Sequence, residues 1–261
     1  MIELTHRATR AVKRRIFGPA LRVLECEDLI RLGSRYGGWV FVDQGVLSGC
    51  TLVSMGLGED ASFDVEFASK YSANVVMFDP TPRAIEHFRE LEGQLGQSAS
   101  VSYSQGGSQP IEAYDLAAIT PGQLSLIPQA VSDRSGVVRF YAPKDERHVS
   151  HSIVNFQNAY STTSPFIEVS AIAVSEIAAM FSDPEATVVK MDIEGAEILA
   201  LPQLFDHDWL PQQILVEYDE LNFPSRRARN NFNRVHTQVL NAGYEMTYWD
   251  QRSCVSYIRK T

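Results

Sequence analysis

Residues 187–201 read TVVKMDIEGAEILAL and predict a buried strand that leads directly into a helix. The first five residues are apolar or β-branched except for Lys190, and the apolar pattern that restarts at Ile198 suits a helix. Three carboxylates, those of Asp192, Glu194 and Glu197, fall at the junction. Because an open α/β sheet binds its ligands beyond the carboxyl ends of its strands, this junction is a candidate site.

A simpler interpretation of the same acids stays open. Glu194 and Glu197 could do no more than favour the start of the helix through its dipole. This alternative fits Glu197 better than Asp192, which falls at the tip of the strand itself.

A second junction of strand, turn and helix lies earlier in the chain. Residues 51–55 form an apolar run, and GLGED at residues 56–60 is followed by a helical pattern. Gly56 and Gly58 allow a sharp turn and a close approach to a ligand, and the helix start offers free N–H groups. The next strand, residues 74–78, ends at Asp79, which is well placed to accept hydrogen bonds from ribose hydroxyls.

The rest of the chain alternates strands and helices and closes with an antiparallel hairpin, which predicts an α/β fold. Further strands are expected at residues 39–42, 124–131, 137–141, 166–174, 213–218, 244–249 and 254–259. Further helices are expected at 175–181, with Ser175 as its cap, and at 227–241. Residues 96–123 and 142–165 are polar and are expected to be loop insertions.

The amino-terminal segment differs from the remainder in charge. Residues 1–22 carry six basic side chains and one acid, and residues 3–32 have helical spacing interrupted by Gly18-Pro19. We therefore expect a basic helical segment over residues 1–36 and one main domain over 37–261. The first helix could make weak contact with an anionic membrane surface, although a solvated helix that covers the domain is the commoner arrangement.

Composition narrows the classes of partner and compartment. The chain has 261 residues and a net charge of −9, which argues against a nucleic-acid partner. Its three cysteines form no C-x-x-C pair, so neither a disulfide framework nor a zinc site is expected. Without a signal peptide or a long apolar run, a cytoplasmic location is expected. The oligomeric state is left open.

With the two strand-to-helix junctions described above, residues 39–259 resemble the FkbM-type branch of the S-adenosylmethionine-dependent methyltransferases. Residues 189–197, VKMDIEGAE, are similar to that family's K-x-D-x-E-G-x-E signature, and AVSD at 130–133 supports the match. The resemblance implies a Rossmann-like methyltransferase fold. Its seven-stranded sheet is mostly parallel with an antiparallel last strand, and helices cover both faces. It also implies S-adenosylmethionine as cofactor, and oxygen methylation of a sugar, glycan or natural product.

The resemblance also adds residues to the expected cofactor site. Ala130 and Val131 join it through the supporting motif. Many methyltransferases carry an acid two residues before the first glycine of the turn, where this chain has Ser54. Contact with the methionine amine is therefore expected from Glu59 or Asp60.

Three residues are expected to do the chemistry. Asp192 and Glu194 are placed to bind or deprotonate an acceptor hydroxyl, and His151 is a further candidate base, although a histidine in a polar loop is more often only exposed. Lys190 is expected to pair with an acid in a structural salt bridge. No metal is expected, but the alternative that Asp192, Glu194, Glu217 and Asp219 converge on a divalent cation stays open.

Two other functions remain possible from the residues alone. Gly56-x-Gly58-x-x-Ala61 followed by Asp79 partly fits the fingerprint of a nucleotide-dependent oxidoreductase. A non-catalytic cofactor-binding protein on a methyltransferase fold is the other alternative.

Overall fold

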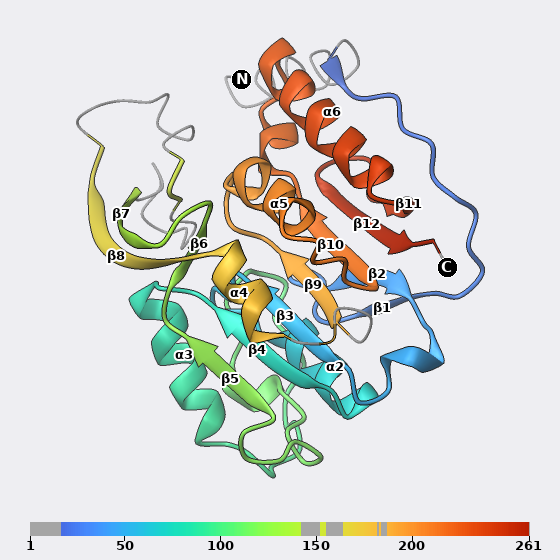
Figure 1. Ribbon diagram of the computed structural model, residues 1–261. Helices are drawn as coiled ribbons and strands as arrows, with labels where there is room; N and C mark the ends of the chain where they lie inside the picture. The colour runs from blue at the N-terminus through green and yellow to red at the C-terminus, as the bar shows by residue number, and fades with distance from the viewer. Residues whose placement is uncertain (1–16, 142–151, 155–163, 182, 184–186, 261) are drawn as a thin grey trace, which may run out of the picture.

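A seven-stranded sheet runs through the middle of the protein in the computed structural model, which describes residues 17–141, 152–154, 164–181, 183 and 187–260 (Figure 1). Its strands are β3 (Thr51–Met55), β4 (Asn74–Phe78), β5 (Leu124–Ile127), β9 (Thr187–Met191), β10 (Gln213–Glu217), β11 (Tyr244–Trp249) and β12 (Cys254–Arg259). The strand order is β11-β12-β10-β9-β3-β4-β5. Only β12 runs against its neighbours, so the expected mostly parallel sheet with an antiparallel last strand is confirmed.

Helices cover both faces of this sheet, as expected (Figure 1). They are α2 (Ser62–Tyr71), α3 (Pro82–Glu92), α4 (Val174–Met180), α5 (Glu197–Asp206) and α6 (Arg226–Asn241). Successive strand residues point to opposite faces. Leu52 and Val188 pack with α2 and α3, whereas Val53 and Val189 pack with α4, α5 and α6. The central strands are therefore buried on both sides, which explains their continuous apolar runs.

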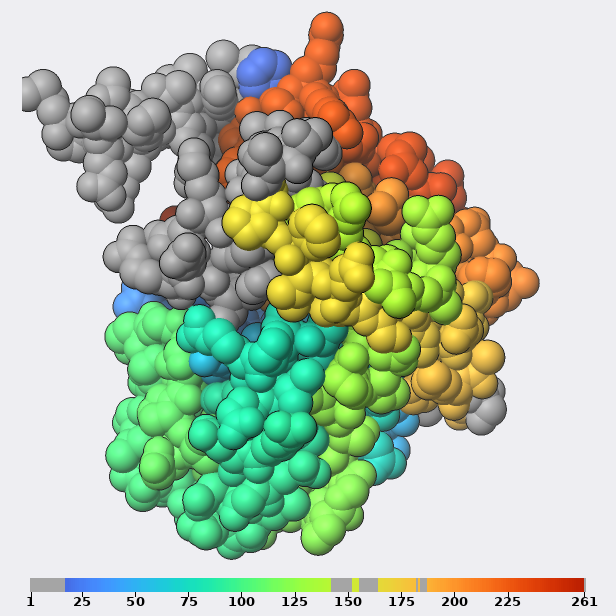
Figure 2. All heavy atoms as spheres, turned by 90° about the vertical axis from the view of Figure 1, so that its left-hand side faces the viewer, coloured from blue at the N-terminus to red at the C-terminus, as the bar shows by residue number. Residues whose placement is uncertain are grey.

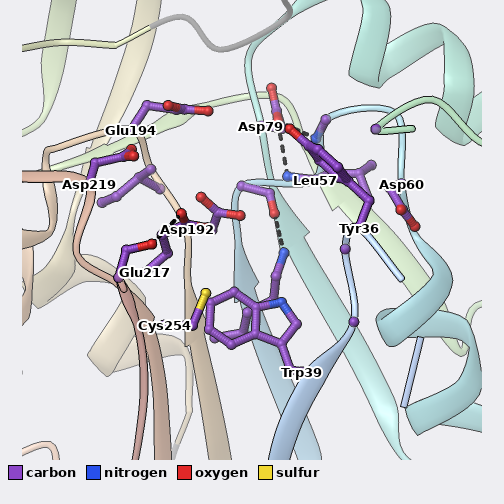
Figure 3. Close-up of a pocket in the computed structure, with 18 of the residues that line it drawn as sticks. Tyr36, Trp39, Leu57, Asp60, Asp79, Asp192, Glu194, Glu217, Asp219 and Cys254 are labelled. Carbon is purple, nitrogen blue, oxygen red and sulfur yellow. Dashed lines mark hydrogen bonds between the residues drawn. The ribbon is translucent and has the colours of Figure 1, made fainter. Parts of the chain in front are cut away.

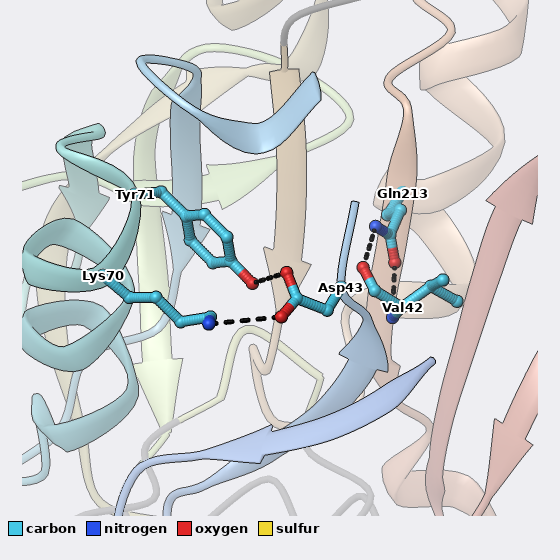
Figure 4. Close-up of polar contacts among 5 residues, drawn as sticks. All are labelled: Val42, Asp43, Lys70, Tyr71 and Gln213. Atoms are coloured by element: carbon cyan, nitrogen blue, oxygen red, sulfur yellow. Dashed lines mark hydrogen bonds and ion pairs between the residues drawn. The ribbon is translucent and has the colours of Figure 1, made fainter. Parts of the chain in front are cut away.

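A two-stranded hairpin made of β1 (Leu29–Leu32) and β2 (Trp39–Val42) lies beside the main sheet. The side chain of Gln213 joins the two parts (Figure 4). Its amide accepts a hydrogen bond from the Val42 N–H at 3.0 Å and donates one to the Val42 carbonyl at 2.8 Å. The adjoining Asp43 accepts a hydrogen bond from the Tyr71 hydroxyl at 2.7 Å and pairs with Lys70 at 3.1 Å. These contacts fix the hairpin against β10 and α2.

A separate three-stranded sheet follows β5 in the chain. It consists of β6 (Ala130–Ser132), β7 (Gly136–Tyr141) and β8 (Phe166–Ala173). In Figure 2 the yellow atoms of β8 lie on the surface above the teal atoms of α3. Val137 and Phe166 are exposed, so this sheet is only partly buried.

Three expectations about local structure were wrong. Residues 18–28 are not helical and Leu29–Leu32 is a strand, because pairing with β2 outweighs the helical spacing of the apolar residues. The strand expected over 124–131 is two strands in different sheets, separated at Pro128, which has no N–H to donate. Helix α4 begins at Val174, so Ser175 is not its cap.

Other expectations about the loops and the amino terminus fall partly outside the described residues. Residues 1–16 lie outside the described part of the chain, so the expected membrane contact of this segment stays a prediction. The domain boundary at residue 36 also stays a prediction. Most of the loop at 142–165 is also outside them. The loop at 96–123 holds one short helix, Ile111–Ala113, and returns to the turn after β3 through Gln109. No described helix is long and apolar enough to span a membrane.

Candidate active site

The carboxyl ends of β3, β4, β9 and β10 meet at one edge of the sheet and open into a pocket of about 580 Å³ (Figure 3). Gly56 follows β3, Asp79 follows β4, Asp192 follows β9 and Glu217 ends β10, and all four line the pocket. This volume lies within the range of about 300–1,000 Å³ that small-molecule sites occupy. The two junctions singled out in the sequence are therefore parts of one site.

The glycine turn after β3 (residues 56–60) and the acidic tip of β9 (residues 192–194) are in direct contact. Gly56 has a φ of +89°, and a Cβ added there would lie 1.8 Å from the Asp192 carbonyl oxygen. The Asp192 N–H donates to the Met55 carbonyl at 2.9 Å, and Lys190 Nζ donates to the Gly56 carbonyl. No side chain fits at Gly56, because both its conformation and its neighbour exclude one.

Asp79 shapes this turn from the next strand. Its Oδ2 accepts hydrogen bonds from the N–H groups of Leu57 at 3.0 Å and Gly58 at 2.9 Å. Its Oδ1 accepts from the N–H and the hydroxyl of Thr81, at 2.8 and 2.6 Å. A carboxylate has about four acceptor positions, so protein donors already use all of them. The expected contact with ribose stays a prediction, and it requires exchange with one of these donors.

Glu59 and Asp60 are also held by protein groups. Glu59 forms an ion pair with Arg83. Asp60 is buried and accepts hydrogen bonds from Ser34 Oγ at 2.6 Å and Gln109 Nε2 at 2.9 Å. Asp60 thus ties together two loops that form one wall of the pocket. Contact of either acid with a methionine amine stays a prediction, in competition with these partners.

Several wall residues were not singled out from the sequence. Ala130 and Val131 line the pocket as expected, but Tyr36 and Trp39 line it too. Burial raises the pKa of Tyr36, and the nearby carboxylates of Asp192 and others raise it further. An aromatic residue before the glycine pair at 37–38 was the available signal, but only the folded hairpin brings it to the pocket.

A group of carboxylates forms the opposite end of the pocket (Figure 3). Asp192, Glu194 and Asp219 each offer one oxygen atom within 4.8 Å of the other two. Burial raises the pKa of Asp192 to about 7, with Glu217 as the next cause. Burial also raises the pKa of Asp219 to about 6, with Asp192 as the next cause. These acids crowd one another, and they titrate closer to neutral pH than free carboxyls do.

Glu197 has a different environment from the other acids of its segment. It is fully buried, and its Oε1 accepts hydrogen bonds from the N–H groups of Ile193 at 2.8 Å and Gly195 at 3.2 Å. These bonds hold the loop in which Glu194 has a φ of +56°. Glu197 therefore stabilises the backbone of the segment that carries Asp192 and Glu194.

Lys190 and Asp64 form a buried polar layer under the turn. Asp64, on α2, is fully buried, and burial raises its pKa while the charge of Lys190 lowers it. Lys190 is 4% exposed and lies opposite Ser54 in the sheet, with its ammonium 6.0 Å from the Trp39 ring centroid. Lys190 was expected to pair with an acid, but its hydrogen-bond partner among the described residues is the Gly56 carbonyl, and its charge acts on Asp64 only by lowering the pKa of that acid.

His151, the third expected catalytic residue, lies outside the described residues. The adjacent Ser152 is described, and its hydroxyl donates to the Glu194 carbonyl at 2.5 Å. Ile153 lines the pocket. Ser152, next to His151 in the chain, therefore contacts the segment after β9, whereas the role of His151 stays a prediction.

Solved structures give distant likenesses. A fibrillarin pre-rRNA processing protein from Methanococcus jannaschii has a TM-score of 0.41 and 8% identity, over 83% of this chain and 70% of that one. A putative methyltransferase from Streptococcus mutans, in complex with SAH, has a TM-score of 0.38 and 10% identity, over 82% and 90%. Scores this low carry no argument about the site. No curated protein matches the chain.

A family model gives the decisive comparison. The methyltransferase FkbM domain matches residues 50–246, a range that begins just before β3 and ends within β11. It includes the glycine turn, Asp79, the acidic tip of β9 and Asp219. The protein belongs to the FkbM methyltransferase family.

Proposed function

We propose that the protein transfers a methyl group from S-adenosylmethionine to a hydroxyl group of a sugar, glycan or natural product. The observation that carries the proposal is the contact between the Gly56 turn and the Asp192 tip. This contact joins a nucleoside-binding type of turn and a group of hydroxyl-binding carboxylates in one pocket of a methyltransferase-family fold.

The residues at the turn fit such a cofactor. Apart from its two chain neighbours, no atom of the described residues lies within 4 Å of a Cβ built on Gly58, so the described part of the chain leaves space beside the turn. Gly56, Gly58, Asp79, Ala130 and Val131 line that end of the pocket and would hold the nucleoside part. When bound, S-adenosylmethionine supplies an electrophilic methyl group on a positively charged sulfur.

The acidic end of the pocket suits an acceptor hydroxyl. Ionised carboxylates accept hydrogen bonds from hydroxyls, and Asp192 and Glu194 would orient the acceptor oxygen. The raised pKa of Asp192 lets its carboxylate take up a proton near neutral pH, which suits a general base. The negative charge at this end also favours the positively charged sulfur over a neutral group.

The two alternatives predict different ligands. A nucleotide-dependent oxidoreductase would bind NAD, whose pyrophosphate would face the acidic residues Glu59 and Asp60 and the carboxylates of the pocket. A non-catalytic relative would bind the methyltransferase cofactor without transferring a methyl group.

Calorimetric titration with S-adenosylmethionine, S-adenosylhomocysteine and NAD separates these functions. We expect binding of the first two and none of NAD. Labelled methyl transfer from S-adenosylmethionine to a cell extract then identifies the class of acceptor. NAD binding without S-adenosylhomocysteine binding would contradict the proposal.

A further inference from the structure

We propose that Asp192, Glu194 and Asp219, called here the acidic triad, bind one hard divalent cation such as Mg²⁺, Mn²⁺ or Ca²⁺. The triad comes from three places in the chain: the tip of β9, the loop that follows it and the segment after β10. Among the described residues, these are the acids whose oxygen atoms gather closely enough to share an ion. Figure 3 shows the three side chains at the same end of the pocket.

The strongest observation beyond the proximity of the acids concerns Asp219 Oδ2. Asp219 is 8% exposed, and its Oδ2 has no hydrogen-bond donor among the described residues. Asn222 donates to the other oxygen, Oδ1, at 3.1 Å. Glu194, another carboxyl group, is within hydrogen-bonding reach of Asp219, and this contact lowers the pKa of Asp219. A buried acceptor that faces another acceptor is costly unless a cation or a proton lies between them.

A second buried oxygen next to the triad is also without a donor. Glu197 is fully buried, and its Oε2 has no hydrogen-bond partner among the described residues, although its Oε1 accepts two backbone hydrogen bonds. Asp219 is the charged group with the largest effect on Glu197. A cation held by the triad would offset the negative charge on all four acids.

The dimensions fit a hard cation. Calcium binds oxygen at about 2.3–2.6 Å, so two ligands on opposite sides of the ion lie about 5 Å apart. The limit of 4.8 Å between the triad oxygens lies within that span. A donor set made only of carboxylate oxygens favours Mg²⁺, Mn²⁺ or Ca²⁺ over zinc or copper. All three residues of the triad line the pocket, so water or an acceptor hydroxyl could fill the remaining coordination positions.

Neighbouring groups orient the ligands as outer-shell partners do at metal sites. Asn222 donates to both Asp219 and Glu217, and Ser152 holds the backbone carbonyl of Glu194. With the cation bound, Asp192 would be its ligand and would orient the acceptor hydroxyl through the ion, not act as a general base; this role in methyl transfer rests on the proposed function. The binding of the ion does not rest on it.

Mn²⁺ alone is the probe for a direct test on the full chain, with free Mn²⁺ counted by electron paramagnetic resonance at physiological ionic strength. We expect one Mn²⁺ per chain, displaced by Mg²⁺ or Ca²⁺, and a rise in melting temperature with the ion. Asp219→Asn and Glu194→Gln keep the shape of the side chain and should each weaken binding by more than about tenfold. Asp250→Asn removes an acid of the same pocket outside the triad and should leave the affinity within about twofold.

The outcomes are distinct from those of the cofactor test. No bound Mn²⁺ in the folded protein, or an affinity unchanged in both triad variants, would overturn the cation site. Equal loss in Asp250→Asn would overturn it as well, because the pocket would then attract ions only by its general charge. The count is made without S-adenosylmethionine, so failure of cofactor binding would contradict the proposed function and leave the cation site standing.

Discussion

Lys190 donates a hydrogen bond from its Nζ to the carbonyl oxygen of Gly56 and thereby links strand β9 to the glycine turn after β3. The same ammonium is the cationic group that offsets Asp64, a fully buried acid on α2. The Lys190 side chain thus stabilises the glycine turn and also favours the ionised form of the buried Asp64.

Lys190→Met should destabilise the fold by about 1–3 kcal/mol, because it leaves the Gly56 carbonyl without its charged donor and removes a positive charge that favours the ionised form of the buried Asp64. Urea denaturation measures the loss. The double variant Lys190→Met, Asp64→Asn should recover part of it, since no uncompensated carboxylate remains. If the two single losses simply added in the double variant, the two residues would not be coupled.

The two glycines of the turn should respond differently to alanine. Gly56→Ala should abolish cofactor binding and lower the melting temperature strongly, because the new Cβ would overlap the Asp192 carbonyl. Beyond its chain neighbours, Gly58→Ala meets no atom within 4 Å in the described part of the protein, so its φ of +60° is what opposes the change there, at a cost of about 1–2 kcal/mol. Thermal unfolding and calorimetry with S-adenosylhomocysteine compare the pair. Similar losses in both variants would contradict the contact between the turn and the acidic tip.

Asp79→Asn should lower both stability and cofactor affinity. An amide can serve only two of the four donors around Asp79, whichever way it is oriented. We expect a loss of about 2 kcal/mol in stability, and affinity for S-adenosylhomocysteine weaker by about 1.5–3 kcal/mol. Thr81→Ser keeps the hydroxyl and serves as the control. An Asp79→Asn protein with unchanged melting temperature would remove Asp79 from the architecture of the turn.

Asp192→Asn should keep cofactor affinity and lower the rate of methyl transfer by about 10²-fold or more, since its contacts matter mainly in the transition state. Calorimetry and transfer of labelled methyl groups measure the two effects separately. Glu194→Gln should act in the same direction. A structure with S-adenosylhomocysteine in which both carboxylates lie more than about 8 Å from the sulfur would make these acids structural, because the acceptor could not bridge that distance.

His87 should make the protein less stable in mild acid. It is buried against the Tyr114 hydroxyl at 2.7 Å, and burial lowers its pKa below the usual 6.5. The unfolded chain therefore binds this proton first, so stability falls as pH decreases below about 6.5. The buried acids of the pocket have raised pKa values and act in the opposite direction, so the wild type must be compared with His87→Gln. The difference in unfolding free energy between the two should change from pH 7.5 to pH 5; a constant difference would show that His87 does not titrate there.

The sequence predicted the parts of the fold that local patterns control. Strands with continuous apolar runs, such as residues 51–55 and 187–191, were correct because burial on both faces demands such runs. The helix expected near Leu29 was wrong because pairing with a strand ten residues away decides that segment. Such pairing leaves little trace in local spacing.

The residues of the candidate site likewise fall into those that local sequence patterns predicted and those that they did not. The glycine turn, Asp79 and the acidic tip were visible because each follows a strong strand pattern. Tyr36 was not visible as a lining residue of the pocket, and Ser34 and Gln109 were not visible as partners of Asp60, because only the folded loops bring them to these places. The hydrogen bonds that occupy Asp79 were also beyond the sequence, since they depend on how close two strand ends lie.

The Gln213 amide has a consequence for the order in which the protein can assemble during synthesis. It satisfies both backbone groups of Val42 across a separation of 171 residues, and the Ser256 hydroxyl adds a bond to the Val40 carbonyl. The ribosome makes the hairpin that carries Tyr36 and Trp39 long before it makes the docking partners of this hairpin on β10 and β12. A nascent chain that stops before β10 can form the glycine turn but cannot complete the pocket wall, so ligand binding has to wait for the carboxyl-terminal strands.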